Sequence, residues 1–207
     1  MYDNLKLFAK KLNASFKITV LLPHDYDKTN KGYKALYIVS NSNPFSDYKL
    51  NLENIINQKN MIGIAIYPSL DVKKNQLLYN IFDDTYNFSN LYQAFIIKEV
   101  MPLLKEKYRL NSDKEGNYIL GYKDTSLLAY GLAYHYDTFE KLYLFDFDIK
   151  AKKHFLADLM SSFDPSIGFY LNAKDALLAK EIKERLTMFG IIEYHELDSI
   201  LSLETVL

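Results

Sequence analysis

A short apolar strand turns through small residues directly into a helix at 117–135, Asn-Tyr-Ile-Leu-Gly-Tyr-Lys-Asp-Thr-Ser-Leu-Leu-Ala-Tyr-Gly-Leu-Ala-Tyr-His. This order is typical of a nucleophile elbow, in which the pattern small-x-nucleophile-x-small-small displays an attacking side chain above a sheet. Gly121, Thr125 and Ser126 occupy the small positions, and Lys123 stands where a serine would attack. An elbow is catalytic only if the displayed side chain can act as a nucleophile. The sequence therefore predicts the housing of a hydrolytic site without its usual nucleophile.

Lys123 allows two interpretations. An amine becomes a nucleophile when burial lowers its pKa toward neutrality, whereas a solvated lysine simply replaces a lost serine. Asp124 lies one position beyond the nucleophile and would need a shifted turn to attack, so we expect it to favour the dipole of the following helix. Ser126 and Thr125 are expected to cap that helix or to fill the small positions. If their side chains hold helix and strand apart, the turn relaxes and Lys123 takes ordinary backbone angles.

Histidines and carboxylates elsewhere are the remaining candidates for acid–base chemistry. The four histidines lack the spacing of three or four residues that helical metal ligands show, so we predict no metal site; they are His24, His135, His154 and His195. Of these, His195 is the remaining candidate for a general base. Asp146 and Asp148 lie at the carboxyl end of a predicted strand, which is the edge where α/β sheets bind ligands, and a solvated strand end explains this pair equally well.

Apolar runs of strand length alternate with longer amphipathic stretches along the chain. We expect strands at 16–22, 35–40, 61–67, 118–121, 141–147, 167–171 and 191–196. We expect helices at 52–58, at 91–108 with a kink at Pro102, after the elbow, at 152–162 and at 175–189, and a long loop at 68–90. Strands that recur between helices favour a largely parallel sheet covered on both faces, so the predicted class is α/β, in one domain over 1–207.

Composition excludes several classes of function. The 25 basic and 26 acidic residues balance and form no long run, which argues against binding to nucleic acid. Cysteine is absent, so disulfides and thiolate sites are excluded. No apolar stretch reaches the roughly 18 residues of a membrane span, and the first residues do not resemble a signal peptide. We therefore expect a cytoplasmic protein without a membrane anchor.

Several segments, in their order, resemble the esterase family of α/β-hydrolases that includes esterase D-like acyl hydrolases and siderophore esterases. The run Ile18-Thr-Val-Leu-Leu-Pro-His-Asp-Tyr26 is similar to the family's strand that ends in Leu-Pro-x-x-Tyr, and Ala35–Ser40 resembles its next strand. Phe95–Pro102 resembles the helix before the elbow, and Tyr134–Phe139 the stretch after it. The resemblance implies one α/β-hydrolase domain with little or no cap that acts on esters. We expect no cofactor.

The chain departs from the family where the family does its chemistry. In the pattern Gly-x-Ser-x-Gly-Gly the serine is replaced by Lys123, and the resemblance places the acid at Asp175. The family's histidine corresponds to about 198–200, where this chain has none, while His195 lies in the strand before. Instead of a His-Gly pair, 40–43 reads Ser-Asn-Ser-Asn. The side chains expected to line such a site are Ser40, Asn41, Tyr122, Asp124, Ser126 and Asp146.

Three functional hypotheses remain open on the sequence. The first is a degenerate esterase homologue that binds a small ester or acyl ligand, or a protein partner, without turnover. The second is a carboxylic-ester hydrolase with a rearranged site built from Lys123, Asp124, Ser126 or His195. The third is a self-associating structural protein, a homo-oligomer with a buried aromatic interface.

Overall fold

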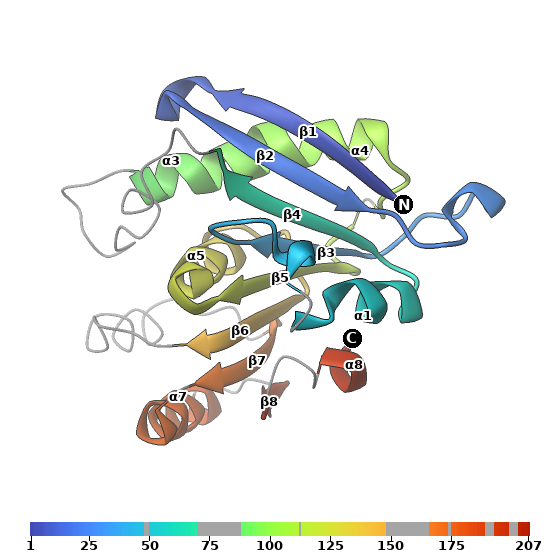
Figure 1. Ribbon diagram of the computed structural model, residues 1–207. Coiled ribbons are helices and arrows are strands. Elements are labelled where there is room, and N and C mark those ends of the chain that lie inside the picture. Colours follow the sequence, from blue (N-terminus) through green and yellow to red (C-terminus); the bar gives the residue numbers. More distant parts are fainter. Residues whose placement is uncertain are drawn as a thin grey trace.

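A mixed sheet runs through the computed structural model, which describes residues 1–47, 50–69, 88–111, 113–147, 166–173, 175–188, 193–198 and 203–207. Its eight strands lie in the order β1-β2-β4-β3-β5-β6-β7-β8 (Figure 1). The strands β3 to β8 run parallel, while β2 is antiparallel to both β1 and β4. Their bounds are Tyr2–Ala9 (β1), Ala14–Leu21 (β2), Ala35–Val39 (β3), Ile62–Pro68 (β4), Asn117–Tyr122 (β5), Lys141–Phe147 (β6), Gly168–Ala173 (β7) and Tyr194–Glu196 (β8).

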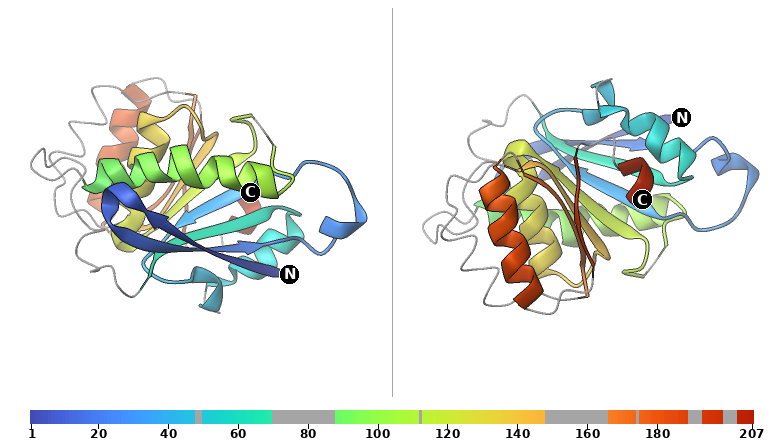
Figure 2. Two further views of the ribbon diagram at one scale, coloured as in Figure 1. Left: turned by 90° about the horizontal axis from the view of Figure 1, so that it is seen from above. Right: turned by 90° about the horizontal axis from the view of Figure 1, so that it is seen from below.

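Helices cover both faces of this sheet. The buried residues of α3, α4, α5 and α7 belong to one hydrophobic cluster, and those of α1 and α8 belong to a second. The views in Figure 2 show the two groups on opposite sides of the strands. The helices are Leu52–Gln58 (α1), Phe88–Phe95 (α3), Met101–Lys107 (α4), Ser126–His135 (α5), Ala176–Met188 (α7) and Leu203–Val206 (α8).

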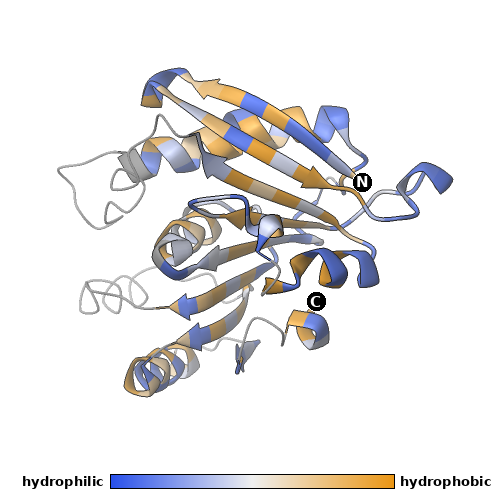
Figure 3. Ribbon diagram, in the orientation of Figure 1, coloured by the Kyte–Doolittle hydropathy of each residue, from blue (hydrophilic) through white to orange (hydrophobic). Residues whose placement is uncertain are grey.

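The central strands are buried on both faces, as parallel strands between helical layers must be. All five residues of β3 are buried, and their side chains alternate between the two clusters. Figure 3 shows the corresponding hydrophobic stretches along the middle of the sheet. The predicted α/β class is confirmed, and the strand order reverses between β3 and β5, which places a topological switch point there.

Several elements differ from the sequence prediction. No strand was expected at Tyr2–Ala9, which forms β1 because alternate residues face the core while the others face outward. The helix expected at 91–108 is divided by a π-helical turn at Ile96–Val100, just before Pro102, whose missing N–H cannot complete the regular ladder. The helix expected at 152–162, most of the loop expected at 68–90, and Asp148 lie outside the described residues.

Candidate functional site

The elbow keeps its strained geometry. Strand β5 ends at Tyr122, a 3-10 turn covers Lys123–Thr125, and α5 begins at Ser126. Lys123 has a φ of 54°, in the left-handed region, where a side chain costs roughly 1–2 kcal/mol. The turn therefore has not relaxed, and Lys123 is displayed at the apex as a nucleophile would be.

The hydrogen bonds of their hydroxyl groups explain why Thr125 and Ser126, which are larger than glycine, fit at the small positions of the elbow. Thr125 Oγ1 donates to the Val39 carbonyl at 2.7 Å and accepts from the Tyr122 N–H at 3.1 Å. Ser126 Oγ donates to the Phe145 carbonyl at 3.4 Å. Both residues are buried, so these bonds satisfy polar atoms that would otherwise be costly. Thr125 thereby ties the carboxyl end of β3 to the elbow.

The Lys123 side chain is half-exposed and lies among acidic and aromatic groups. Its Nζ lies 3.9 Å from Asp146 Oδ2 and 4.6 Å from the centre of the Tyr122 ring. The Tyr122 hydroxyl, followed by the carboxylates of Asp146 and Asp47, holds the pKa of Lys123 above its ordinary value. Lys123 is therefore a charged ammonium at neutral pH. An amine nucleophile requires the opposite shift.

Asp146 reaches the elbow because β6 bulges at its carboxyl end. The register between β6 and β7 shifts between Leu144 and Phe147, and Asp146 has a φ of 50°. Its N–H donates to Asn172 Oδ1 at 3.2 Å. Asn172 Nδ2 in turn donates to the carbonyls of Leu197 and Asp198, at 2.8 and 3.0 Å. Asn172 thus joins the ends of β6, β7 and β8, a role that the sequence analysis missed.

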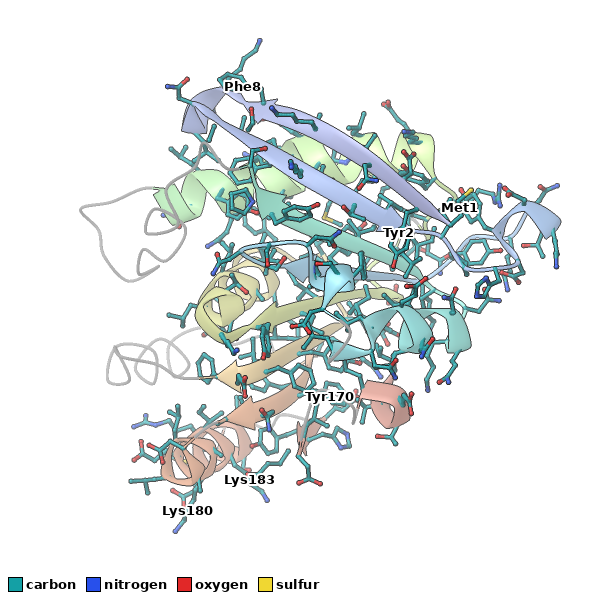
Figure 4. All side chains as sticks on the ribbon, in the orientation of Figure 1. Met1, Tyr2, Phe8, Tyr170, Lys180 and Lys183 are labelled. Atoms are coloured by element: carbon teal, nitrogen blue, oxygen red, sulfur yellow. The ribbon has the colours of Figure 1, made fainter. Side chains whose placement is uncertain are left out.

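The structure does not bring His195 to the elbow. In the sheet register, His195 lies opposite Tyr170, which lies opposite Tyr143 and then Leu120. Three strand spacings, about 14 Å, therefore separate His195 from β5. Its ring stacks on Tyr170 (labelled in Figure 4) at a centroid distance of 4.9 Å. The prediction of His195 as a general base for this site has no geometric support, because β8 lies three strands away from β5, the strand that carries the elbow.

Asp175, the position that the resemblance gives to the acid, caps a helix instead. Its Oδ1 accepts from the Leu177 N–H at 2.8 Å, at the start of α7. Among the contacts of the described residues, none joins Asp175 to Lys123 or His195. Among the described contacts, the three candidate catalytic residues are therefore not joined to one another.

A cavity of about 400 Å³ opens beside the elbow at the carboxyl ends of β3 and β5. This is the switch point of the sheet, where α/β folds bind ligands. Its floor is apolar, whereas its rim is polar and includes the ammonium group of Lys123 and the carboxylate of Asp47. The residues that line it are Ile38, Ser40, Asn41, Ser42, Asn43, Pro44, Ser46, Asp47, Leu50, Leu52, Leu120, Tyr122 and Lys123.

Three of the residues predicted to line the site do line this cavity, namely Ser40, Asn41 and Tyr122. Ser126 does not, because its hydroxyl is buried beneath α5 against the Phe145 carbonyl. Asp146 lies beside Lys123 without lining the cavity. The side chain of Asp124 lies outside the described part of the structure. The described residues hold no group of three or more side chains that could bind a metal ion, and none of their helices is long and apolar enough to cross a membrane.

Solved esterases share this architecture at low sequence identity. A ferulic acid esterase superposes with a TM-score of 0.71 at 17% identity, covering 100% of this chain and 94% of its own. An IroE-like serine hydrolase from Shewanella oneidensis gives 0.71 at 13%, covering 100% and 77%. The enterobactin esterase from Shigella flexneri, solved in the presence of enterobactin, gives 0.73 at 10%, covering 100% and 58%.

Comparison of the sequence with family models and with curated proteins found no relatives. No family model matches the chain, and no curated protein matches it. The superpositions on the ferulic acid esterase and on the IroE-like serine hydrolase each cover the whole of this chain. The chain therefore has the α/β-hydrolase fold, in the form shared by ferulic acid and siderophore esterases.

Proposed function

We propose that this chain is a non-catalytic binding protein that holds a small ester or acyl compound in the cavity beside the elbow. The observation that carries the proposal is the position of Lys123. Its ammonium occupies the strained apex of the elbow and lines the cavity. Backbone strain of this kind persists where the surrounding structure enforces it, and it clusters at functional sites.

Binding is favoured over turnover by the chemistry at the apex. A serine mechanism needs a hydroxyl nucleophile and a base within hydrogen-bond reach. Lys123 supplies a cation whose raised pKa keeps its lone pair protonated, and His195 stacks on Tyr170 three strands away. These observations also argue against the alternative hypothesis that Lys123 attacks an ester.

The lining suggests how an acyl compound would lie. We expect its carbonyl or carboxylate oxygen to accept a hydrogen bond from Lys123, since charge-assisted bonds are the strongest of their kind. Its apolar part would cover Ile38 and Leu120 on the floor. Asn41 lines the cavity and its buried Oδ1 has no hydrogen-bond partner in the structure, so a turn of this side chain would let Oδ1 accept from a hydroxyl on the ligand.

Calorimetric titration with ferulate and methyl ferulate tests this function, with the acyl group suggested by the similar ferulic acid esterase. We expect the wild-type chain to bind ferulate. Lys123→Met keeps the length of the side chain and removes the charge, so ferulate affinity should fall by about tenfold or more, as the loss of a charged hydrogen bond implies. Methyl ferulate lacks the carboxylate charge, so its affinity should fall less than that of ferulate in Lys123→Met.

Lys183→Met is the matched control, because Lys183 is an exposed lysine on α7 (Figure 4) and does not line the cavity. It should bind ferulate as the wild type does. Equal affinity in Lys123→Met and wild type would remove Lys123 from the binding site. A wild-type chain that binds neither compound would contradict an aromatic acyl ligand.

A further inference from the structure

Strand β1 is a long edge of the sheet. It spans eight residues and pairs only with β2 among the described strands. The opposite edge, β8, has three residues. The left view of Figure 2 looks onto β1, which lies in the foreground. A long exposed edge offers unpaired backbone groups to another strand.

The hydrogen-bond pattern fixes which residues of β1 direct their backbone N–H and C=O groups toward the free edge of the sheet. Met1 and Leu22 exchange both backbone bonds, at 3.2 and 2.9 Å, so they form a hydrogen-bonded pair. In an antiparallel ladder such pairs alternate with non-hydrogen-bonded ones. The odd-numbered residues of β1 therefore bond to β2. The even-numbered residues Tyr2, Asn4, Lys6 and Phe8 direct their N–H and C=O groups toward the free edge.

Two exposed aromatic side chains lie near the ends of this edge. Tyr2 is 42% exposed and Phe8 is 54% exposed. Figure 4 shows them at opposite ends of β1. Because side chains alternate along a strand, both project from the same face of the sheet.

We propose that β1 pairs antiparallel with β1 of a second copy of this chain, about a two-fold axis at Leu5. In such a pair, residues whose backbone groups face the free edge must lie opposite one another. Only registers that place even-numbered residues of one copy opposite even-numbered residues of the other are therefore possible. The axis at Leu5 sets Tyr2 opposite the partner's Phe8 and Asn4 opposite the partner's Lys6. It thus uses all four outward-facing residues of each strand, and each exposed aromatic meets another, a favourable cross-strand pair.

The two neighbouring registers, with the two-fold axis at Lys6 or at Asn4, would give a less favourable pairing of side chains. An axis at Lys6 would place Lys6 directly opposite the partner's Lys6, and like charges in that position are destabilising. An axis at Asn4 would leave Phe8 beyond the paired residues. Of these three registers, the axis at Leu5 is therefore the one that pairs both exposed aromatic side chains and keeps Lys6 from lying opposite itself, in the self-complementary manner of a two-fold interface.

Light scattering coupled to size-exclusion chromatography tests the pairing, with a dimer expected at twice the 24.2 kDa of one chain. Lys6→Pro removes an outward-facing N–H but none that bonds to β2, and proline is tolerated at such edge positions. It should raise the dimer dissociation constant by at least about tenfold. Lys6→Ala keeps the N–H and should remain dimeric. Dimers in both variants, or a wild type that stays monomeric at its highest soluble concentration, would overturn the proposal.

Disulfide trapping tests the register, because the chain contains no cysteine of its own. At a non-hydrogen-bonded pair the Cα atoms lie about 4.5 Å apart, within disulfide range, so Leu5→Cys should form a covalent dimer on mild oxidation. Asn4→Cys and Lys6→Cys should not, because neither lies opposite itself. Cross-linking through Lys6→Cys instead would overturn the register. If Leu5→Cys does not fold, failure of both other cysteines to cross-link, together with the proline and alanine pair, still decides the pairing.

Discussion

Gly121→Ala should lower the free energy of unfolding by about 3 kcal/mol, which is near the upper end of what overpacking costs. A Cβ at Gly121 would lie 2.6 Å from Ser126 Cα and 2.9 Å from the Thr125 carbonyl oxygen. These are backbone atoms at the entry of α5, so the strain cannot be relieved by turning a side chain. For a chain of this size the midpoint of thermal unfolding should fall by roughly 6–12 °C. Calorimetry or circular dichroism would measure it.

Gly32→Ala is the matched control for this clash. Gly32 is exposed, and its Cβ would lie 2.5 Å from Asn111 Oδ1, which is the end of a flexible, partly exposed side chain. That side chain can turn away, so the unfolding midpoint should change little. If Gly121→Ala were as stable as Gly32→Ala, the close contact between β5 and α5 would not exist as described.

Thr125→Val should cost about 2 kcal/mol of stability. The change keeps the size of the side chain but removes the hydroxyl that bonds the Val39 carbonyl and the Tyr122 N–H. These groups lie at a buried position, where an unsatisfied polar atom costs roughly 1–3 kcal/mol. Urea unfolding of the variant beside the wild type would measure the difference.

Thr125→Ser separates the hydroxyl from the methyl group. It retains the hydrogen bonds and loses one buried carbon, so it should cost only about 0.8 kcal/mol. Thr125→Val should therefore be the less stable of the two. The reverse order would mean that the methyl group, and not the hydroxyl, holds β3 to the elbow.

The alternation of strands and helices was predictable because it rests on local patterns. Helix α1 at Leu52–Gln58 and strand β6 at Lys141–Phe147 have the predicted bounds, since their apolar residues follow the helical and strand periods. The elbow was recognised from the small residues between β5 and α5. Strand β1 was missed because Asp3 lies on the inward side while Tyr2 and Phe8 face outward, which interrupts the alternation of apolar and polar residues expected of a half-buried strand.

The site was less predictable because distant residues decide it. The backbone of Lys123 stays strained since Thr125 and Ser126 bond to carbonyls on β3 and β6, which sequence order does not place nearby. Asn172 lacks a local signal for its bonds to the ends of the neighbouring strands. The position of His195 depends on the register of β8, and that register carries it away from the elbow.

The measurement that tests the central claim most directly is turnover of p-nitrophenyl butyrate by the wild-type chain and by Lys123→Ala. Only product beyond one equivalent is counted, because surface lysines can be acylated once. The account predicts no sustained turnover above buffer in either protein, since the apex carries a protonated amine and His195 lies three strands away from it. Sustained wild-type turnover that is lost in Lys123→Ala would contradict it and make Lys123 part of a hydrolytic mechanism.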